Sequence, residues 1–344
     1  MARVAFLDDG LPFNGQTGFT GPIGGAEGAV VSLAERLSGR RNDVTVYNRC
    51  LNPTEHNGVR WIPLDAGPIA ASDLYIVNRN PGLMARLPGK ARASLWLHND
   101  AGYLKKLRHA ASILRYRPKA VLLSAYHNET WPRPLSVSQR HVIPLGVDDF
   151  FRADQERKDA PAPIAVFASN PQRGLAPLLD IWETSIWPRA PEAELHLFTR
   201  ADFYGTGAKS APLFEPILAR ARAMRGQNVI VRNMVSRREL AACLHTARVM
   251  LYWGDTSHAE TYCLSVAEAQ TAGVPCIARS IGALPERIID QKTGFLVRSA
   301  QAFAESAVTT LTDDVRWREL SGNALAAAPS SWDEVADKFE HLHA

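Results

Sequence analysis

Short apolar runs alternate with longer amphipathic segments along almost the whole chain. In the first half, the runs with the length of a buried strand are RVAFLDD, VTVYN, LYIVN, ASLWLHN and AVLLSA, and AEGAVVSLAERLSGR has the periodicity of a helix. In the second half, the runs IAVFAS, AELHLFTR, NVIVRN, VMLYWG and PCIARS alternate with helical segments such as LAPLLDIWETSIW and RRELAACLHTA. This rhythm predicts parallel sheets with helices on both faces.

A change of composition near residue 148 divides the chain. The segment DDFFRADQERKDAPAP is charged and contains prolines, as linkers do. We therefore expect two doubly wound, Rossmann-like domains, over residues 1–148 and 149–330. Residues 331–344 form a third segment, an amphipathic helix with Ser331 as N-cap and Glu334 at N3. Ligands of such sheets bind beyond the carboxyl ends of the strands.

Composition narrows the function classes. An apolar fraction of 46% and a net charge of +4 are those of an ordinary globular protein, and no nucleic-acid-binding motif accompanies them. The four cysteines are scattered, which indicates reduced thiols in a cytoplasmic protein and no metal site. The first residues, MARVAFLDDG, are typical of a strand and not of a signal peptide, and no apolar run is long enough to span a membrane.

The segment HAETYCLSVAEAQTAGVPCIA carries two glutamates eight residues apart. Glu260 lies in the loop before a helix expected to start near Tyr262, and the amides of Tyr262, Cys263 and Leu264 would be first-turn donors able to bind an anion. Glu268 lies on an apolar helix, where a carboxylate needs a partner. The spacing alone leaves two interpretations open: both carboxylates serve one site, or both are ordinary helix charges.

Two further loops suggest contacts with phosphate. The glycines of GPIGGAEGAVV precede the first helix, so the backbone there can approach a phosphate closely. Arg173, in ASNPQRGLAPLLDIW, is expected to open a helix, where a cation is unfavourable unless an anion joins it. Arg173 is therefore either a clamp for a diphosphate or a solvated arginine.

The segment ETYCLSVAE resembles the E-x7-E motif of glycosyltransferase family 4. The similarity continues through AQTAGVPCIARSIGALPERIIDQKTGFLV, and it includes GPIGGAEGAVVSLAERLSGRRNDVTVY, VIPLGVDDFF and SSWDEVADKF in the same order. It implies a GT-B fold, in which two Rossmann-like domains face a central cleft and the C-terminal helix crosses back to the first domain. It also implies a retaining, metal-independent transferase that needs no cofactor besides a nucleotide diphosphate sugar as co-substrate.

The resemblance assigns roles to individual residues. Glu260 would hold hydroxyls of the donor sugar and Glu268 the ribose hydroxyls, because a carboxylate can accept from two neighbouring O–H groups. The amides of Tyr262, Cys263 and Leu264 would face the sugar and the phosphates. The remaining assignments are a sugar contact by His98, diphosphate contacts by Gly24, Gly25 and Arg173, and a donor-binding loop at Gly282, with lesser candidates at Asn14, Thr17, Asn99, Asp100, His127, Asn128, Ala283 and Glu286.

The chain departs from the family pattern at two places. Cys263 stands where the family often has glycine, and a side chain there would narrow the sugar pocket. Ser169 and Asn170 occupy a loop where the family commonly has an arginine, which leaves the use of the donor open. The basic amphipathic segment YLKKLRHAASILRYRPKA either contacts anionic lipid at the inner membrane face or is a solvated helix.

The function expected from these features is transfer of a hexosyl group from a nucleotide sugar, with UDP as the expected nucleotide. The acceptor would be a glycan, a lipid-linked precursor or a small molecule, as in polysaccharide biosynthesis. Stabilisation of the leaving diphosphate by Arg173, the glycine loop and the amides would supply most of the catalysis. Two alternatives remain at this level: a nucleotide-sugar epimerase or hydrolase on the same fold, and a non-catalytic nucleotide-binding protein.

Overall fold

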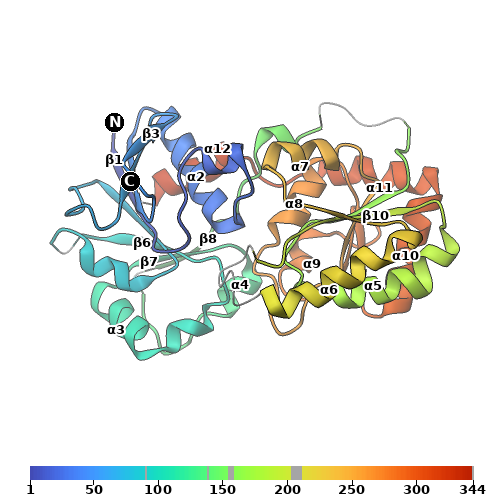
Figure 1. Cartoon of the computed structure of the whole chain (residues 1–344). Coiled ribbons are helices and arrows are strands. Elements are labelled where there is room, and N and C mark those ends of the chain that lie inside the picture. Colours follow the sequence, from blue (N-terminus) through green and yellow to red (C-terminus); the bar gives the residue numbers. More distant parts are fainter. Residues whose placement is uncertain (90, 138, 154–158, 203–210, 343–344) are drawn as a thin grey trace. The chain divides into compact units, whose positions relative to one another are not determined.

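The computed structural model describes residues 1–89, 91–137, 139–153, 159–202 and 211–342. These residues form two compact units (Figure 1). The first unit combines Met1–Gly146 with Ser330–Ala344, and the second comprises Val147–Pro329.

The first unit contains one sheet in the order β3-β4-β2-β1-β5-β6-β7-β8. Its strands are parallel except for β3 and β4, which pair antiparallel. Leu7 at the end of β1 is aligned with Tyr47 on one side and Val77 on the other, so the carboxyl ends of these strands lie level. The strands are β1 (Arg3–Leu7), β2 (Asp43–Asn48), β3 (Thr54–His56), β4 (Val59–Pro63), β5 (Leu74–Asn78), β6 (Ala93–Trp96), β7 (Lys119–Leu122) and β8 (Gln139–Val142).

Helices cover both faces of this sheet, with α2 and α12 on one face and α3 on the other (Figure 1). Successive side chains at the end of β6 point to opposite faces of the sheet. Trp96 packs on Trp332 and Phe339 of α12, whereas Leu95 and Leu97 join the core under α3. The helices are α1 (Thr17–Thr20), α2 (Gly25–Gly39), η1 (Pro81–Arg86), η2 (Ala101–Lys105), α3 (Leu107–Tyr116), α4 (Ala125–Glu129) and α12 (Trp332–His341).

The C-terminal helix α12 belongs to the first unit, which confirms the return of the chain that the resemblance implied. Ser331 and Glu334 form the expected capping box at its N-terminus. Arg40, just after α2, donates to the Asp333 carbonyl at 2.8 Å and to Glu340 at 3.0 Å, and it also pairs with Asp337. The helix is thus held by its apolar face and by a group of ion pairs.

The second unit contains a fully parallel sheet in the order β11-β10-β9-β12-β13-β14. Both sheets confirm the Rossmann-like α/β class. The strands are β9 (Ile164–Phe167), β10 (Glu194–Phe198), β11 (Val229–Arg232), β12 (Val249–Tyr252), β13 (Cys276–Arg279) and β14 (Gly294–Val297). The helices are η3 (Asp149–Phe151), α5 (Leu175–Ile181), η4 (Trp182–Ile186), η5 (Trp187–Arg189), α6 (Ala211–Ala223), η7 (Met224–Gln227), α7 (Arg237–Leu244), α8 (Leu264–Thr271), α9 (Leu284–Arg287), α10 (Ala300–Thr312) and α11 (Asp314–Ala326).

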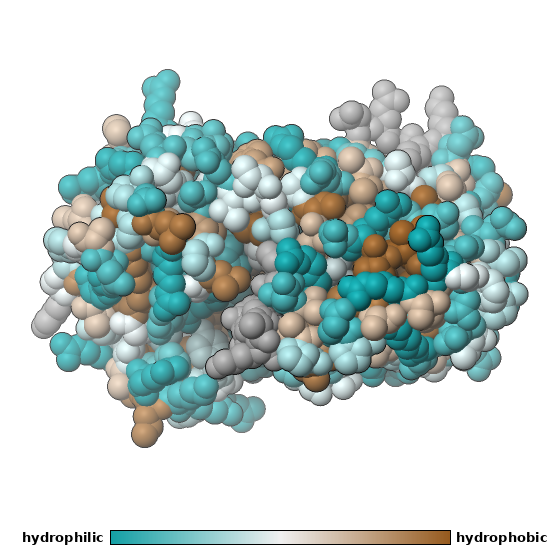
Figure 2. All heavy atoms as spheres, in the orientation of Figure 1, coloured by the Kyte–Doolittle hydropathy of each residue, from teal (hydrophilic) through white to brown (hydrophobic). Residues whose placement is uncertain are grey.

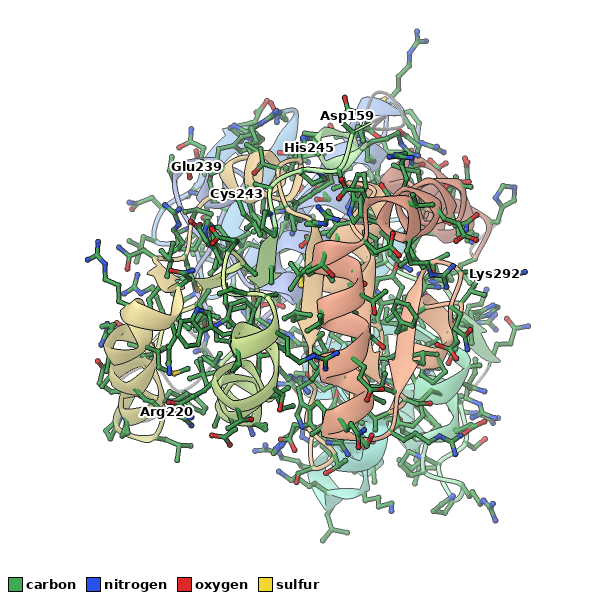
Figure 3. All side chains as sticks on the ribbon, turned by 90° about the vertical axis from the view of Figure 1, so that its right-hand side faces the viewer. Asp159, Arg220, Glu239, Cys243, His245 and Lys292 are labelled. Atoms are coloured by element: carbon green, nitrogen blue, oxygen red, sulfur yellow. The ribbon has the colours of Figure 1, made fainter. Side chains whose placement is uncertain are left out.

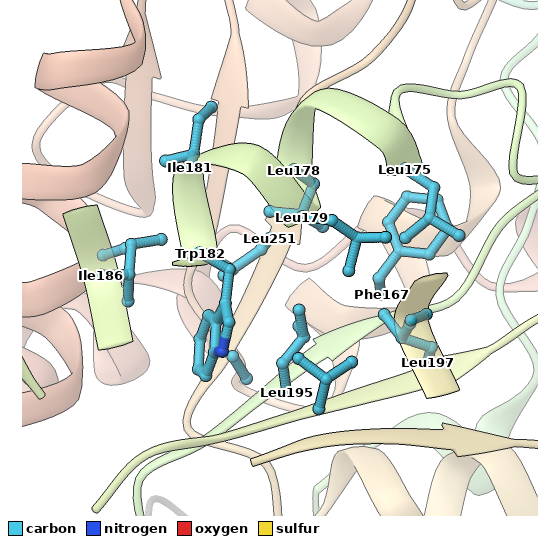
Figure 4. Packing of buried hydrophobic residues seen from close by; sticks show 14 of the residues in the cluster. Phe167, Leu175, Leu178, Leu179, Ile181, Trp182, Ile186, Leu195, Leu197 and Leu251 are labelled. Atoms are coloured by element: carbon cyan, nitrogen blue, oxygen red, sulfur yellow. The ribbon is translucent and has the colours of Figure 1, made fainter. Parts of the chain in front are cut away.

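The core of the second unit fills the space between the sheet and helices α5, α6 and α10. Leu175, Leu178 and Leu179 of α5 point toward Leu195 and Leu197 of β10 (Figure 4). The sequence predicted one continuous helix over LAPLLDIWETSIW, but the α-helix ends at Ile181 and continues as the π-helical turn η4. From this turn, the buried indole of Trp182 donates to the carbonyl of Gln227 in η7 at 2.9 Å.

One expectation about a segment needs correction, and one strand pair was not anticipated. The segment after residue 148 was expected to be a linker, yet Asp149–Phe151 forms η3 with Phe151 buried, and residues 154–158 of that segment lie outside the described residues. The pair β3 and β4 was not anticipated, because TEH is short and polar and VRWIP is only five residues long. On the face shown in Figure 2, exposed apolar side chains are mostly scattered among hydrophilic ones.

Candidate active site

Glu260 is held in a network of charged and polar side chains beyond the carboxyl end of β12. The Tyr252 hydroxyl donates to its Oε1, and Arg173 Nε lies 3.2 Å from the same oxygen. Burial raises the pKa of Tyr252 well above its ordinary value, so this hydroxyl stays protonated and keeps donating. The Glu260 carboxylate therefore has a fixed direction and a balanced charge.

Arg173 lies in the loop that follows β9. It precedes Gly174, the N-cap of α5, so the arginine stands just before the helix and does not open it as expected. Its Nη1 donates to the His258 carbonyl, which ties this loop to the loop that carries Glu260. Burial lowers the pKa of the Arg173 guanidinium, but nearby negative charges, led by Glu260, raise it above its ordinary value. The fixed cation predicted here is present and paired with a carboxylate.

Cys263 has a left-handed backbone and caps the E-x7-E helix. Its φ is +66°, and α8 starts at Leu264, two residues later than the sequence suggested. Only Leu264 of the three expected amide donors is therefore in the first turn. Cys263 and Tyr262 are both buried, and burial raises the pKa of the Tyr262 hydroxyl to about 12. The left-handed φ explains why a glycine suits position 263, because L-residues with a Cβ pay for this conformation.

Three glycines let the loops around Glu260 approach one another. Gly282 has φ +57°, and a Cβ there would lie 2.6 Å from the Glu260 carbonyl oxygen. The Ala283 amide donates to the same carbonyl at 2.8 Å. Gly174, at φ +90°, lies against Gly254, where a Cβ would come within 2.5 Å of the Gly254 carbonyl oxygen. The structure thus brings Gly282, Arg173 and Glu260 together.

Glu268 is buried on α8 and faces a cation that the sequence reading overlooked. Its Oε1 lies 2.8 Å from Arg237 Nη1, and Arg237 Nη2 lies 2.9 Å from Asp148 Oδ2. Among the described residues, Glu268 Oε1 accepts no well-aligned hydrogen bond, so the contact with Arg237 is an ion pair with acceptor capacity left over. Burial raises the pKa of Glu268. The positive charge of Arg237 is the second largest influence, and it lowers this pKa.

The loop that lacks the family arginine closes on itself. Asn170 accepts from the Gln172 amide at 2.9 Å through its side chain and from the Arg173 amide at 2.8 Å through its carbonyl. Asn170 therefore shapes the turn that presents Arg173.

The Gly24–Gly25 turn of the first unit leads directly into α2, with Gly24 as N-cap. It carries a negative charge that the sequence reading had not considered. Glu27 is buried, and a Cβ at Gly24 would lie only 2.2 Å from its Oε2. Arg79 balances this charge, with Nη1 2.9 Å from Glu27 Oε1 and Nη2 2.8 Å from Asp8 Oδ2. A phosphate at this turn would meet Glu27 and Arg79 together.

His98 follows β6 at the carboxyl edge of the same sheet, 4.6 Å from the Trp96 ring between centroids. Burial, then the charges of Arg79 and His127, hold the pKa of His98 well below its ordinary value, so its imidazole is neutral at pH 7. His127 has a supporting place: its Nδ1 accepts from the Leu123 amide at 3.1 Å, and its Nε2 donates to the Asn99 carbonyl at 2.8 Å. The neutral His127 ring thus fixes the loop that carries His98.

The lesser candidates of the first unit make mainly local contacts. Asn14 and Thr17 bond to each other at the start of α1, with the Asn14 amide 2.9 Å from Thr17 Oγ1. Asp100 accepts from the Gly102 amide at 2.7 Å and caps η2.

Comparison with known proteins identifies the family. Residues 163–313 match the family model described as Glycosyl transferases group 1. The D-inositol 3-phosphate glycosyltransferase of Xylanimonas cellulosilytica is 26% identical over 415 residues, which cover 99% of this chain and 96% of the relative. The chain is a glycosyltransferase, and its residues 163–313 match group 1.

Solved structures agree on the fold of this glycosyltransferase. Sucrose-phosphate synthase from Thermosynechococcus elongatus matches with a TM-score of 0.76 at 18% identity, over 100% of this chain and 98% of that one. Anabaena HepE in complex with UDP-glucose matches with a TM-score of 0.72 at 15% identity, over 99% of each chain. The glycosyltransferase thus has the GT-B fold, and as a retaining family 4 enzyme it uses a nucleotide sugar as donor.

Several side chains around the glycosyltransferase's predicted residues were missed from the sequence. Tyr252 looks like any apolar residue of a buried strand, and Asp148 was assigned to a linker. Arg237 carried a usable signal, because it is a cation at the first position of α7, the same feature that drew attention to Arg173. Glu27 and Arg79 are 52 residues apart in the sequence, and only the sheet topology brings them together.

Helix α3 of the glycosyltransferase has an exposed apolar stripe. Leu107 and Leu114 are 89% and 53% exposed, whereas Ile113 on the opposite side is buried. Lys106, Arg108 and Arg115 are exposed beside the two leucines. Within the described ranges, no helix has the length and apolar character needed to cross a bilayer. In the same ranges, no group of three or more His, Cys, Asp and Glu side chains could hold a metal ion.

Proposed function

We propose that this glycosyltransferase moves a hexosyl group from a UDP-sugar to an acceptor hydroxyl, with retention and without a metal ion. The observation that carries the proposal is the pair Glu260 and Glu268. One carboxylate is clamped by Tyr252 and Arg173, and the other is buried with unused hydrogen-bond capacity. Two such acceptors, eight residues apart with the N-terminus of α8 between them, suit a ligand that presents hydroxyls on both sides of a diphosphate.

Each donor-binding residue has a role in this proposal. Glu260 accepts from hydroxyls of the sugar, and Glu268 accepts from the ribose diol. The Leu264 amide at the start of α8 faces the phosphates, with the backbone of Tyr262 and Cys263 beside it and Gly282 keeping the adjoining loop close. The complex of HepE with UDP-glucose supports UDP as the nucleotide.

Arg173 stabilises the leaving diphosphate. A guanidinium has five N–H donors. The described residues engage those of Arg173 on Nε and Nη1, so donors remain for phosphate oxygens. Donors of this kind, aimed at charge that develops in the transition state, contribute about 2.7–4 kcal/mol each. No general base is assigned, because in this mechanism the leaving phosphate takes the proton of the acceptor hydroxyl.

The first unit contributes His98 and the Gly24–Gly25 turn. The neutral His98 imidazole can hydrogen-bond a sugar hydroxyl without adding charge. The backbone amides of the turn could bind a phosphate, and Arg79 offsets the negative charge of Glu27. The acceptor classes of this proposal are glycans, lipid-linked precursors and small molecules. The name of the curated relative, D-inositol 3-phosphate glycosyltransferase, describes the acceptor of that protein and does not select among these classes.

The exposed stripe of α3 supports peripheral contact with an anionic membrane surface at the cytoplasmic face. Leu107 and Leu114 would enter the headgroup region, with Lys106, Arg108 and Arg115 pairing with anionic lipid. Co-sedimentation with phosphatidylglycerol vesicles tests this: Leu107→Asp with Leu114→Asp should abolish binding, and equal binding of the variant contradicts the contact.

A donor screen tests the proposed reaction. Purified enzyme is incubated with radiolabelled UDP- and GDP-sugars and candidate acceptors, and the products are separated, with His98→Ala, Arg173→Ala and Glu260→Ala in parallel. The proposal expects label on an acceptor with the wild type and a loss of at least 100-fold in each variant. Label only in free or epimerised sugar supports the hydrolase or epimerase instead. Undiminished turnover in all three variants discards the site.

A further inference from the structure

Three charged side chains with little exposure connect the first residues of the second unit with helices α7 and α8. Asp148 precedes η3, Arg237 is the first residue of α7, and Glu268 lies on α8. Their side chains are only 14%, 14% and 5% exposed. Figure 3 locates α7 by the labelled Glu239, Cys243 and His245.

The guanidinium of Arg237 is fixed from several directions. Its Nε and Nη2 donate to Asp148 Oδ2 at 3.2 and 2.9 Å, which leaves Nη1 directed at Glu268. The Phe151 ring packs against the guanidinium, with 5.2 Å from Cζ to the ring centroid. His245, the C-cap of α7, donates from Nε2 to the Phe151 carbonyl at 3.0 Å, which anchors Phe151 in turn. Arg237 therefore has one orientation available.

Two carboxylates share this one cation, so the group as a whole carries an excess negative charge. Asp148 takes two of the arginine's N–H bonds, whereas Glu268 receives a close but poorly aligned contact and keeps acceptor capacity. A buried carboxylate in this condition is stabilised by further O–H donors. A diol with two adjacent hydroxyls supplies two donors to one carboxylate.

Glu268 can act purely as an acceptor only while its carboxylate is ionised, and for this it needs the nearby arginine. Burial favours the neutral acid, which would have one O–H donor and fewer acceptor sites for a diol. The guanidinium opposes that change, and its planar fork sets the direction of the carboxylate in a way that a flexible lysine would not.

We propose that Arg237 is a positioning residue for the donor: anchored by Asp148 and Phe151, it keeps Glu268 ionised and directed at the ribose diol of the nucleotide. This inference rests on the proposed function, in which Glu268 binds ribose. Arg237 itself does not touch the donor.

Calorimetric titration of UDP and of 2′,3′-dideoxy-UDP separates positioning from stability. The wild type should prefer UDP by about 10- to 150-fold, the range for hydrogen bonds to a charged group. Arg237→Met should reduce this preference to less than about threefold, because the diol no longer meets a directed carboxylate. Arg237→Lys should restore part of it.

Arg248 provides the matched control. It is a buried arginine of the second unit, bonded to the Thr310 carbonyl at 2.8 Å and to Asp314 at 2.6 Å, and it has no contact with Glu268 among the described residues. Arg248→Met should lower stability but leave the UDP preference within about threefold of wild type.

The outcomes discriminate between the two proposals. If the wild type binds neither UDP nor GDP, the proposed function fails. If it binds GDP instead, GDP and 2′,3′-dideoxy-GDP replace the two uridine nucleotides in the titration. Binding without a preference for the ribose hydroxyls overturns the inference alone. So does an undiminished preference in Arg237→Met, or an equal loss in Arg237→Met and Arg248→Met. If Arg237→Met does not fold, Arg237→Lys decides: a preference equal to wild type overturns the inference, and a reduced one supports it.

Discussion

Replacing Cys263 by glycine removes a side chain from a backbone conformation that disfavours it. Cys263 is 4% exposed with φ +66°, and Cys276 is 0% exposed in strand β13. The two cysteines belong to the same unit and lose the same atoms on substitution by glycine. Cys276→Gly therefore serves as the matched reference for Cys263→Gly.

The free energies of unfolding of the two variants should differ by the cost of the left-handed conformation. Each substitution loses the buried CH₂–SH group, about 1–2 kcal/mol, and adds about 0.5–1 kcal/mol of backbone entropy in the unfolded chain. Only Cys263→Gly also recovers the left-handed cost of about 1–2 kcal/mol. We expect Cys263→Gly to lower stability by about 0–2 kcal/mol and Cys276→Gly by about 1.5–3 kcal/mol.

Urea unfolding followed by tryptophan fluorescence measures both variants against wild type. The second unit contains the buried Trp182, which reports its transition. Equal destabilisation by the two substitutions, or a greater loss in Cys263→Gly, would refute the strain argument. Steady-state assays on the same samples then show whether removal of the thiol broadens the range of donor sugars, as a wider pocket beside Glu260 requires.

Three further predictions concern other contacts. Tyr252→Phe removes the hydroxyl that donates to Glu260 and should lower kcat/KM by about 10- to 150-fold, whereas Tyr75→Phe, whose hydroxyl accepts from the Ser72 amide at 2.7 Å, should change it less than about threefold. Arg40→Ala should destabilise the first unit by about 1–2 kcal/mol in urea unfolding, against less than about 0.5 kcal/mol for Arg3→Ala at an exposed ion pair. Burial lowers the pKa of His127 below 6.5, so the unfolded state binds the additional proton and stability falls as the pH drops through that value. His127→Gln should reduce the slope of the unfolding free energy against pH by about 1.4 kcal/mol per pH unit. An unchanged slope contradicts the assignment.

Strands and the motif helix could be predicted because their signals are local. VTVYN, LYIVN and VMLYWG are strands as expected, and the capping box at Ser331 is visible in four consecutive residues. The N-terminus of α8 was misplaced by two residues because Cys263 takes a φ that no propensity for cysteine suggests. Backbone conformations of that kind are imposed by tertiary packing.

Long-range ion pairs could not be predicted in the same way. Glu268 was expected to need a partner, but nothing in the sequence points to Arg237, 31 positions earlier, or to Asp148 beyond it. Arg79 and Glu27 meet only because β1 lies between β2 and β5. The residue types of the candidate site follow from its motif, whereas the groups that orient them follow from the order of the strands.

The placement of α12 has a consequence for synthesis of the chain. The second unit is one continuous segment, but the first is completed by residues from Ser330 onward. Trp96 is covered by Trp332 and Phe339, so this part of the first sheet stays open to water until residues 332–339 have left the ribosome. Although its strands are made first, the N-terminal unit is the last to close its core, and a nascent chain stalled before residue 330 presents that face to chaperones and proteases.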